Sequence, residues 1–347
     1  MQRLLIANRS EIARRIARSA RERGLETVGV FAPEDAALAR EYGTSQLAAL
    51  PGAGPSAYLD VDALVRVASE QGCDALHPGY GFASERPALA RACEAAGLRF
   101  VGPSADTLER FGDKASARTL AQRLGVPVLD GSSQPVDLDA LREFRARLPE
   151  GTSLVLKAVA GGGGRGMRIV APGEDLAAAL ARCRSEAHRA FGVEAVIAER
   201  HLAEARHVEV QVAGDRAGTI VVLGDRECSL QRRHQKLIER APATGVSDTL
   251  RATLHDAARA IAREAGLEGL GTIEFLLDAQ GGAFFLEANP RLQVEHTITE
   301  EVTGVDLVGL QLDLAAGRSL DELGLAVPPR PRGHAIQLRL LAETIAE

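Results

Sequence analysis

The chain has no tryptophan, few other aromatic residues and a marked shortage of two polar residue types. Of its 41 basic residues only three are lysine (Lys114, Lys157 and Lys236), and it contains only two asparagines, Asn8 and Asn289. The ammonium group of lysine is a compact point charge, and the broad guanidinium fork of arginine does not replace it at every site. We therefore interpret the three lysines as residues held where arginine fails, against the alternative of three chance survivors.

Other absences exclude whole classes of protein. No apolar run approaches the ~20 residues of a membrane span, and the N-terminus lacks the pattern of a signal peptide. The four cysteines are scattered without metal or disulfide spacing, which favours a reducing compartment, the cytoplasm. The net charge is −6, without long runs of one sign, so we expect neither nucleic acid nor membrane as a partner.

The 347 residues are 46% hydrophobic and 25% charged, which indicates a globular protein of two or three domains. Strands are predicted at 4–8, 26–31, 73–76 and 98–101, and helices at 11–23, 61–70 and 86–96. This alternation predicts a parallel sheet flanked by helices. Because no GxGxxG follows the first strand, a dinucleotide site is not indicated.

The composition changes near residue 130, and a compact βαβ-type unit is predicted beyond it. Its predicted strands are 153–158, 167–170 and 195–199, with a helix at 175–190. Further strands are predicted at 207–213, 218–225, 271–278 and 283–287, and helices at 248–265 and 305–316. We therefore divide this α/β chain, α+β overall, into residues 1–112, 113–203 and 204–347.

A glycine-rich loop lies at residues 160–166 (AGGGGRG), between two predicted strands. Successive glycines let backbone N–H groups converge on an anion, and they let a loop close over a nucleotide. Lys157 lies on the strand that leads into this loop, within reach of the same phosphates. The alternative is a flexible surface turn.

Two carboxylates, Glu274 and Glu287, lie on predicted strands joined by a turn at 279–282. A hairpin would bring them to one face, where with Asn289 they form an all-oxygen set suited to Mg²⁺ or Mn²⁺. The alternative is ordinary pairing with arginines.

Two further runs concentrate polar chemistry. Arg291, Gln293 and Glu295 alternate, so an extended backbone would project them to one side, where they could bind a small oxyanion and take its proton. Residues 229–236 (SLQRRHQK) place three basic side chains and His234 close together, as in a pocket for a triphosphate and an acid. The alternatives are a polar edge strand and structural histidines.

Together these motifs resemble the biotin carboxylases, which are ATP-grasp proteins. The signature-like segments are 223–242 (LGDRECSLQRRHQKLIERAP) and 287–300 (EANPRLQVEHTITE), supported by 5–13 (LIANRSEIA), 77–85 (HPGYGFASE), 111–114 (FGDK) and 157–167 (KAVAGGGGRGM). The resemblance implies an ATP-grasp fold. Residues 1–112 would be the parallel-sheet pre-ATP-grasp domain, 113–203 a linker and a small mobile lid, and 204–347 an incomplete catalytic domain with a mixed or antiparallel sheet.

The resemblance also implies a role for particular residues. It implies that ATP is contacted by Lys114, Lys157, Gly163, Gly164, Glu199, Arg200, His201, Leu202, His207, Gln231 and His234. It implies two metal ions, Mg²⁺ or Mn²⁺, on Glu274, Glu287 and Asn289. Bicarbonate would be bound by Lys236, Arg291, Gln293 and the backbone of Val294, with Glu295 as its base and Arg339 facing biotin.

The implied activity is that of a ligase that forms a C–N bond, the ATP-dependent carboxylation of biotin by bicarbonate through carboxyphosphate. Its implied partners are a biotin carboxyl carrier domain or protein, a carboxyltransferase component, as in an acyl-CoA carboxylase, and a second copy in a homodimer. We expect a C-terminally truncated portion of such an enzyme, with Arg339 poorly held because it lies near the last residue.

Several residues depart from the family motifs. Ser10 replaces a glycine, Gln337 and Leu340 replace residues of the biotin side, and Ala83, Arg200, His201 and Pro290 differ as well. Two other functions therefore stay open. One is an ATP-grasp ligase that joins a carboxylate to an amine, and the other is a nucleotide-binding scaffold that is catalytically incomplete.

Overall fold

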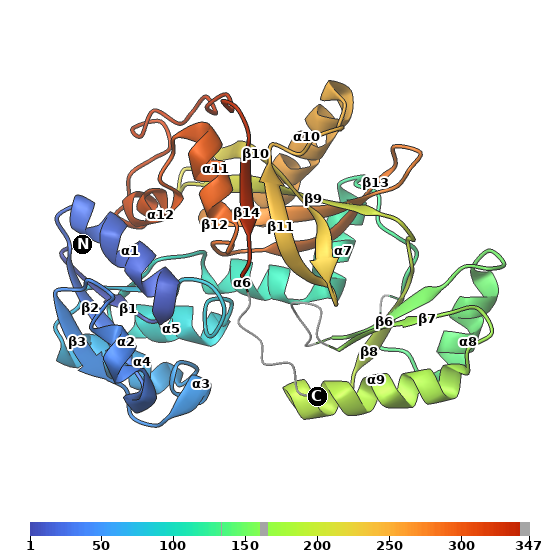
Figure 1. Cartoon of the computed structure of the whole chain (residues 1–347), viewed down its shortest axis with the longest axis horizontal. Helices are drawn as coiled ribbons and strands as arrows, with labels where there is room; N and C mark the ends of the chain where they lie inside the picture. The colour runs from blue at the N-terminus through green and yellow to red at the C-terminus, as the bar shows by residue number, and fades with distance from the viewer. Residues whose placement is uncertain (133, 160–165, 341–347) are drawn as a thin grey trace.

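The computed structural model describes residues 1–132, 134–159 and 166–340, and its strands form three sheets that follow one another along the chain (Figure 1). The first sheet has five strands, the second has three and the third has six. This mixed α/β architecture confirms the predicted fold class, while the boundaries drawn at 112 and 203 stay a prediction.

The first sheet is parallel throughout, in the order β3-β2-β1-β4-β5. Its strands are β1 (Arg3–Ile6), β2 (Glu26–Phe31), β3 (Gln46–Ala49), β4 (Ala75–His77) and β5 (Arg99–Phe100). The helices around it are α1 (Ser10–Glu22), η1 (Pro33–Asp35), α2 (Ala36–Ala39), α3 (Gly54–Ala57), α4 (Val61–Glu70) and α5 (Pro87–Ala95). The predicted parallel sheet is confirmed, and each predicted element here lies within two residues of an observed one.

Alternating side chains of β1 explain why helices cover both faces of this sheet. Leu4 and Ile6 pack with Ile16 of α1 on one face, whereas Leu5 packs with Leu64 of α4 on the other. Side chains that alternate along a strand point to opposite faces, so a strand that is apolar at every position is buried on both.

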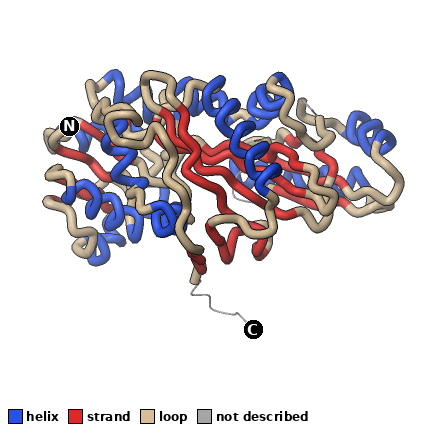
Figure 2. Tube along the Cα trace, turned by 90° about the horizontal axis from the view of Figure 1, so that it is seen from above, coloured by secondary structure: helices blue, strands red, loops and turns tan. Residues whose placement is uncertain are grey.

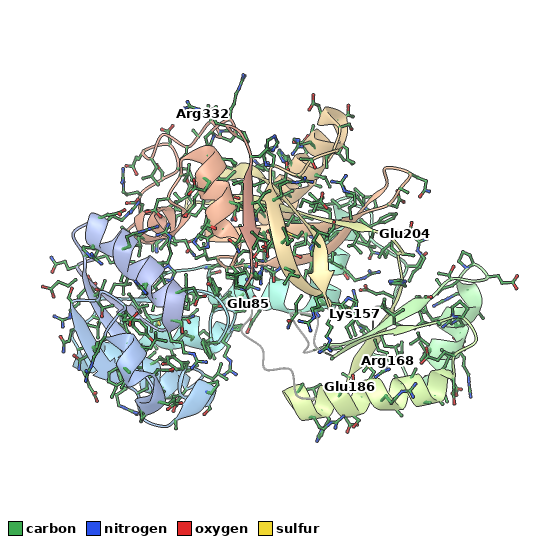
Figure 3. The ribbon with its side chains drawn as sticks, in the orientation of Figure 1. Glu85, Lys157, Arg168, Glu186, Glu204 and Arg332 are labelled. Atoms are coloured by element: carbon green, nitrogen blue, oxygen red, sulfur yellow. The ribbon has the colours of Figure 1, made fainter. Side chains whose placement is uncertain are left out.

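The second sheet belongs to a small unit with its own core. Its elements are α8 (Leu138–Arg147), β6 (Leu154–Ala158), β7 (Met167–Val170), α9 (Leu176–Phe191) and β8 (Val196–Arg200). β6 lies between β7 and β8 and is antiparallel to both, so α9 connects two strands that run the same way. Arg168 pairs with Glu186 at 2.8 Å, joining β7 to α9 (Figure 3). The predicted βαβ-type unit is therefore present, with β6 inserted between its strands.

The third sheet has the order β13-β12-β9-β10-β11-β14, and every strand pair described in it is antiparallel. Its strands are β9 (Arg206–Gly214), β10 (Ile220–Arg232), β11 (Gln235–Ala241), β12 (Gly269–Leu277), β13 (Ala283–Asn289) and β14 (Ala335–Leu338). The remaining helices are α6 (Ala105–Gly112), α7 (Lys114–Arg123), α10 (Asp248–Glu264), α11 (His296–Thr303) and α12 (Leu307–Ala315). The prediction of a strand that ends at 225 is wrong, because β10 continues to Arg232 and forms a hairpin with β11.

The two faces of the third sheet differ in chemistry, as the alternation along β9 shows. Val208, Val210 and Val212 are buried in an apolar core with α10, whereas Glu209 and Gln211 point to the opposite face. Figure 2 shows the long strands of this sheet running through the middle of the molecule. The polar face of these strands is where the candidate site lies.

Candidate functional site

Four charged side chains form a row across the third sheet, one from each of four neighbouring strands. Glu287 of β13 is the cross-strand partner of Glu274 of β12, which is paired in turn with Glu209 of β9 and then with Arg226 of β10. Residues paired across antiparallel strands project from the same face. The predicted approach of Glu274 and Glu287 is therefore confirmed, and it extends to two residues that were not predicted.

Lys236 of β11 reaches into this row and contacts three carboxylates. Its Nζ lies 2.5 Å from Glu209 Oε2, 3.1 Å from Glu274 Oε1 and 2.7 Å from Glu295 Oε1. Burial alone would lower the pKa of Lys236, but the three carboxylates raise it well above its ordinary value. Lys236 is therefore a permanent cation beside these three carboxylates.

Each of these carboxylates has a second basic partner on its other oxygen. Glu274 Oε2 lies 2.5 Å from His207 Nε2, and Glu295 Oε2 accepts from Arg339 Nη2 at 2.9 Å. Glu209 Oε1 accepts from Arg226. Burial would lower the pKa of His207, but Glu274 raises it. The site therefore contains alternating charges, with few neutral groups among them.

Arg291, Gln293 and Asn289 form a second polar cluster beside the row. Arg291 Nη1 donates to Gln293 Oε1 at 2.8 Å, and its Nε donates to Glu85, which lies between β4 and α5. Asn289 Nδ2 donates to Glu274 Oε1 at 2.8 Å. Glu85, labelled in Figure 3, lies near the lower end of the third sheet in that view. The site is thus built from segments more than 200 residues apart.

The predicted extended backbone over 291–295 is wrong. No strand covers this segment, and Glu295 has φ −80° and ψ 12° at the start of α11. The turn nevertheless brings Glu295 to Lys236 and Arg339, while Arg291 faces Asn289. A helix that begins at His296 forces this turn, and alternation of polar residues alone did not reveal it.

The proposed metal ligands fit a hard divalent cation. Glu274 and Glu287 are cross-strand neighbours, and Asn289 Nδ2 lies within 3.3 Å of Glu287 Oε1, so the three side chains converge. Although burial would raise it, the pKa of Glu274 is lowered by Lys236 and His207, which keeps it ionised. A carboxylate and amide oxygen set suits Mg²⁺ or Mn²⁺. To join it, the Asn289 amide would have to turn, because its Oδ1 accepts from Arg291 here.

The other two lysines lie on β6 and α7. Lys157 of β6 pairs with Glu199 of β8, and Arg118 Nη1 lies 3.6 Å from the same carboxylate. Burial lowers the pKa of Lys114, at the start of α7, while Glu287 opposes that effect. Lys157, labelled in Figure 3, belongs to the second sheet. Gly163 and Gly164 lie outside the described residues.

The other predicted nucleotide residues lie at the edges of this region. Arg200 ends β8, and His201 and Leu202 follow it directly. His207 Nδ1 lies 2.9 Å from the amide nitrogen of Gln231 on β10. His234 forms the tip of the β10–β11 hairpin, with a φ of 63° that non-glycine residues rarely adopt.

The expectation that Arg339 is poorly held is wrong. Its backbone N–H donates to Leu237 O at 2.9 Å, and its side chain donates to Glu239 Oε1 at 2.6 Å as well as to Glu295. β14 pairs with β11 just before it, so strand pairing fixes this residue. Burial raises the pKa of Glu239, the carboxylate that accepts from Arg339.

Sequence reasoning missed Glu85, Arg118, Glu209, Arg226 and Glu239. One signal was available for Glu209: polar and valine residues alternate strictly over 207–212, so the polar set had to share a face. Local alternation does not predict which strands lie beside β9.

Matches to known families cover both ends of the chain. Residues 1–108 match the biotin carboxylase N-terminal domain, and residues 113–323 match the ATP-binding domain of the carbamoyl-phosphate synthase L chain. A solved biotin carboxylase of Campylobacter jejuni, in complex with a β,γ-ATP compound, is 37% identical over 97% of this chain and 75% of its own, with a TM-score of 0.91. The chain belongs to the biotin carboxylase family.

Other biotin carboxylase relatives show the same relation. The biotin carboxylase domain dimer of Hydrogenobacter thermophilus 2-oxoglutarate carboxylase, solved with MgADP and bicarbonate, is 36% identical with a TM-score of 0.91, over 97% of this chain and 74% of its own. Mitochondrial pyruvate carboxylase of Rattus norvegicus is 44% identical over 99% of this chain. The chain spans 29% of the length of that pyruvate carboxylase.

Biotin carboxylases are ligases that form a C–N bond, and in biotin-dependent carboxylases they work with a biotin carrier and a carboxyltransferase. Among the described residues of this chain, no helix combines the length and apolar character needed to cross a membrane.

Proposed function

We propose that this chain carboxylates biotin, using ATP and bicarbonate, as the first half-reaction of a biotin-dependent carboxylase. The observation that supports this most directly is Lys236, a partly buried cation that contacts Glu295 on one side and the proposed metal ligand Glu274 on the other. A bicarbonate ion bound at Lys236 would lie between Glu295, the proposed base, and the ATP phosphates held near Glu274.

ATP would lie between the lid and the third sheet. Lys114 and Lys157, with backbone N–H groups of the glycine-rich loop at Gly163 and Gly164, would neutralise its phosphates. Residues 199–202 would contact the adenine, and His207, Gln231 and His234 the ribose and phosphates. Mg²⁺ or Mn²⁺ on Glu274, Glu287 and Asn289 would offset the negative charge of the triphosphate.

Bicarbonate would bind to Lys236, Arg291, Gln293 and the backbone N–H of Val294. Glu295 would take its proton, and a bicarbonate oxygen would then attack the γ-phosphorus and displace ADP. The product, carboxyphosphate, hydrolyses readily, so closure of the lid over it would exclude water.

The second stage would use Arg339. Carboxyphosphate would release CO₂ and phosphate, and the phosphate would remove the ureido proton of biotin. The guanidinium of Arg339 would stabilise the resulting enolate-like anion of biotin. The deprotonated ureido nitrogen of biotin would then attack CO₂. Glu239 and Glu295 hold this guanidinium at 2.6 and 2.9 Å, which orients it for that role.

The partners follow from the chemistry. Biotin would arrive on a carrier domain or protein, and the carboxyl group would pass to a carboxyltransferase component; pyruvate carboxylases and a long-chain acyl-CoA carboxylase are both among the relatives. A homodimer is part of the proposal. The cytoplasmic location stays a prediction, since relatives include mitochondrial and bacterial enzymes.

The test is to incubate the purified protein with Mg·ATP, ¹⁴C-bicarbonate and free biotin and to measure acid-labile ¹⁴C-carboxybiotin alongside ADP. We expect ADP release that requires bicarbonate and label transfer that requires biotin. ATP cleavage that responds to an amine instead would identify the carboxylate–amine ligase, and nucleotide binding without any cleavage would identify the scaffold.

A further inference from the structure

Arg226 forms one end of the charged row, next to Glu209, yet no ligand can reach it. Its relative exposure is 0%, although it is one of the largest side chains of the chain. It donates through Nε to Glu209, and through Nη1 to Gln211 Oε1 and Thr299 Oγ1, both at 2.8 Å. A guanidinium so enclosed acts only on the residues that it touches.

Glu209 connects Arg226 to the site. One of its carboxylate oxygens accepts from Arg226 and the other from Lys236, and its side chain is fully buried. Although burial would raise it, the pKa of Glu209 is lowered by Arg226 and Lys236 together. Removing one cation from such a group leaves a buried charge that only the other can compensate.

The three carboxylates around Lys236 differ in where their second basic partner lies. The partners of Glu274 and Glu295 are His207 and Arg339, whose side chains are 12% and 27% exposed. The second partner of Glu209, Arg226, is wholly enclosed. His207 and Arg339 are thus open to ligands, whereas Arg226 contacts only Glu209 among these three carboxylates.

We propose that Arg226 is a positioning residue for carboxylation, which neutralises Glu209 so that Lys236 keeps its place for bicarbonate. Without Arg226, Glu209 would draw Lys236 toward itself, and the incoming anion would meet an uncompensated carboxylate. This inference rests on the proposed function and adds a residue to which that function assigns no part.

The first test does not depend on activity. Because the chain has only three lysines, ¹⁵N-lysine labelling gives three Nζ resonances, which substitution of each lysine assigns. In Arg226→Gln we expect the Lys236 resonance to move while those of Lys114 and Lys157 stay. Thr299→Val is the matched control, because it removes one buried hydrogen bond of Arg226 and leaves the contact with Glu209. An unmoved Lys236 resonance, or equal movement in the control, would overturn the proposal.

The second test separates positioning from mere stability. In Arg226→Gln we expect the KM for bicarbonate to rise about 10- to 100-fold, while the Kd of Mg·ATP changes less than about threefold. Arg226→Lys, which keeps the charge, should recover part of the loss and also serves if Arg226→Gln does not fold. In a Glu209→Gln background the loss of Arg226 should cost little more, because its partner is then neutral.

Two results would contradict positioning: costs that simply add in the double variant, or a lower melting temperature with an unchanged KM for bicarbonate. If the unaltered protein shows no bicarbonate-dependent ATP cleavage, the proposed function fails, and the Lys236 resonance still decides the role of Arg226.

Discussion

The three lysines lie beside carboxylates of one region. Lys236 contacts three carboxylates, Lys157 shares Glu199 with Arg118, and the partly buried Lys114 lies within the influence of Glu287. The scarcity of lysine thus directed attention to positions that the structure places around one site.

Lys157→Arg tests this interpretation. We expect about tenfold weaker binding of Mg·ATP, or ~1.4 kcal/mol, because the planar fork cannot occupy the same point between phosphate oxygens. Titration calorimetry measures the difference. Arg168→Lys, an opposite exchange in the same lid, is the control and should stay within about twofold. Equal affinity in Lys157→Arg and the unaltered protein would mean that lysine is not required at this position, and would support the alternative of chance survivors.

At the scale of single residues, the sequence indicated which side chains could act in the site, but not which side chains contact one another. Glu274, Glu287 and Lys236 could be chosen because their residue types and motifs are distinctive. Glu209 and Arg226 could not, because their roles depend on which strands lie beside β9 and β10. That register joins segments far apart in the chain, and no local pattern encodes it.

Among the elements, α1 begins under backbone strain. Ser10 has φ 60°, in the left-handed region, and it stands where the family motif has glycine. We expect Ser10→Gly to raise the free energy of unfolding by up to about 1 kcal/mol, because glycine adopts this conformation without a steric penalty. Urea denaturation measures the gain. Ser10→Ala keeps the strain and should show none; a gain in both variants would mean that the side chain, and not the backbone, is at fault.

Two buried histidines at element ends predict acid sensitivity. Burial lowers the pKa of His77, at the end of β4, to about 3, and that of His296, at the start of α11, to about 4. Both are neutral in the fold, so their contribution is intact above the unfolded pKa near 6.5 and is lost as the pH falls below it. Between pH 6.5 and 5.5 each should remove about 1 kcal/mol of stability.

The measurement compares urea unfolding at these two pH values in the unaltered protein and in His77→Gln. The variant should lose about 1 kcal/mol less over the interval. An equal loss in both proteins would show that His77 is protonated in the fold.

Elements with one buried face were predictable, whereas polar hairpins and turns were not. β2, α4 and β7 have the predicted bounds because apolar periodicity defines them. β11 and the outer half of β10 lack that periodicity, since many residues of 226–236 are charged or polar. The turn at 291–295 was misjudged for a different reason, because its polar residues alternate as they would in an extended segment.

In the whole molecule, the first and last parts share an apolar core and a partly buried ion cluster. Leu4 and Ile6 pack in one apolar cluster with Leu270 and Leu307. Arg15 of α1 donates to Glu300 and Asp306, each at 2.7 Å. The first domain is therefore fixed to the third sheet, which holds Glu85 beside Arg291.

Arg15→Met tests this attachment. We expect a loss of about 3 kcal/mol in the free energy of unfolding, because Glu300 and Asp306 would remain partly buried without their cation. The neighbouring Arg14→Met is the control, since Arg14 and Glu41 are 59% and 65% exposed and should contribute little. Similar losses in the two variants, measured by denaturation, would refute a special role for the buried cluster.

At this scale the sequence order predicted a parallel sheet, a small lid and a catalytic sheet. It did not predict how the first domain meets the third sheet. That contact depends on packing of α1 with α12 and of α12 with β12, and most of the chain separates α1 from the other two elements.

The central claim is that Lys236 binds bicarbonate for attack on ATP, and Lys236→Gln tests it most directly. Bicarbonate-dependent ATP cleavage is measured together with the Kd of Mg·ATP in the variant and the unaltered protein. We predict that cleavage falls about 10²- to 10³-fold, as expected for one lost charge-assisted contact in the transition state, while the Kd changes less than about threefold. Unchanged turnover, or a loss explained wholly by weaker ATP binding, would contradict the claim.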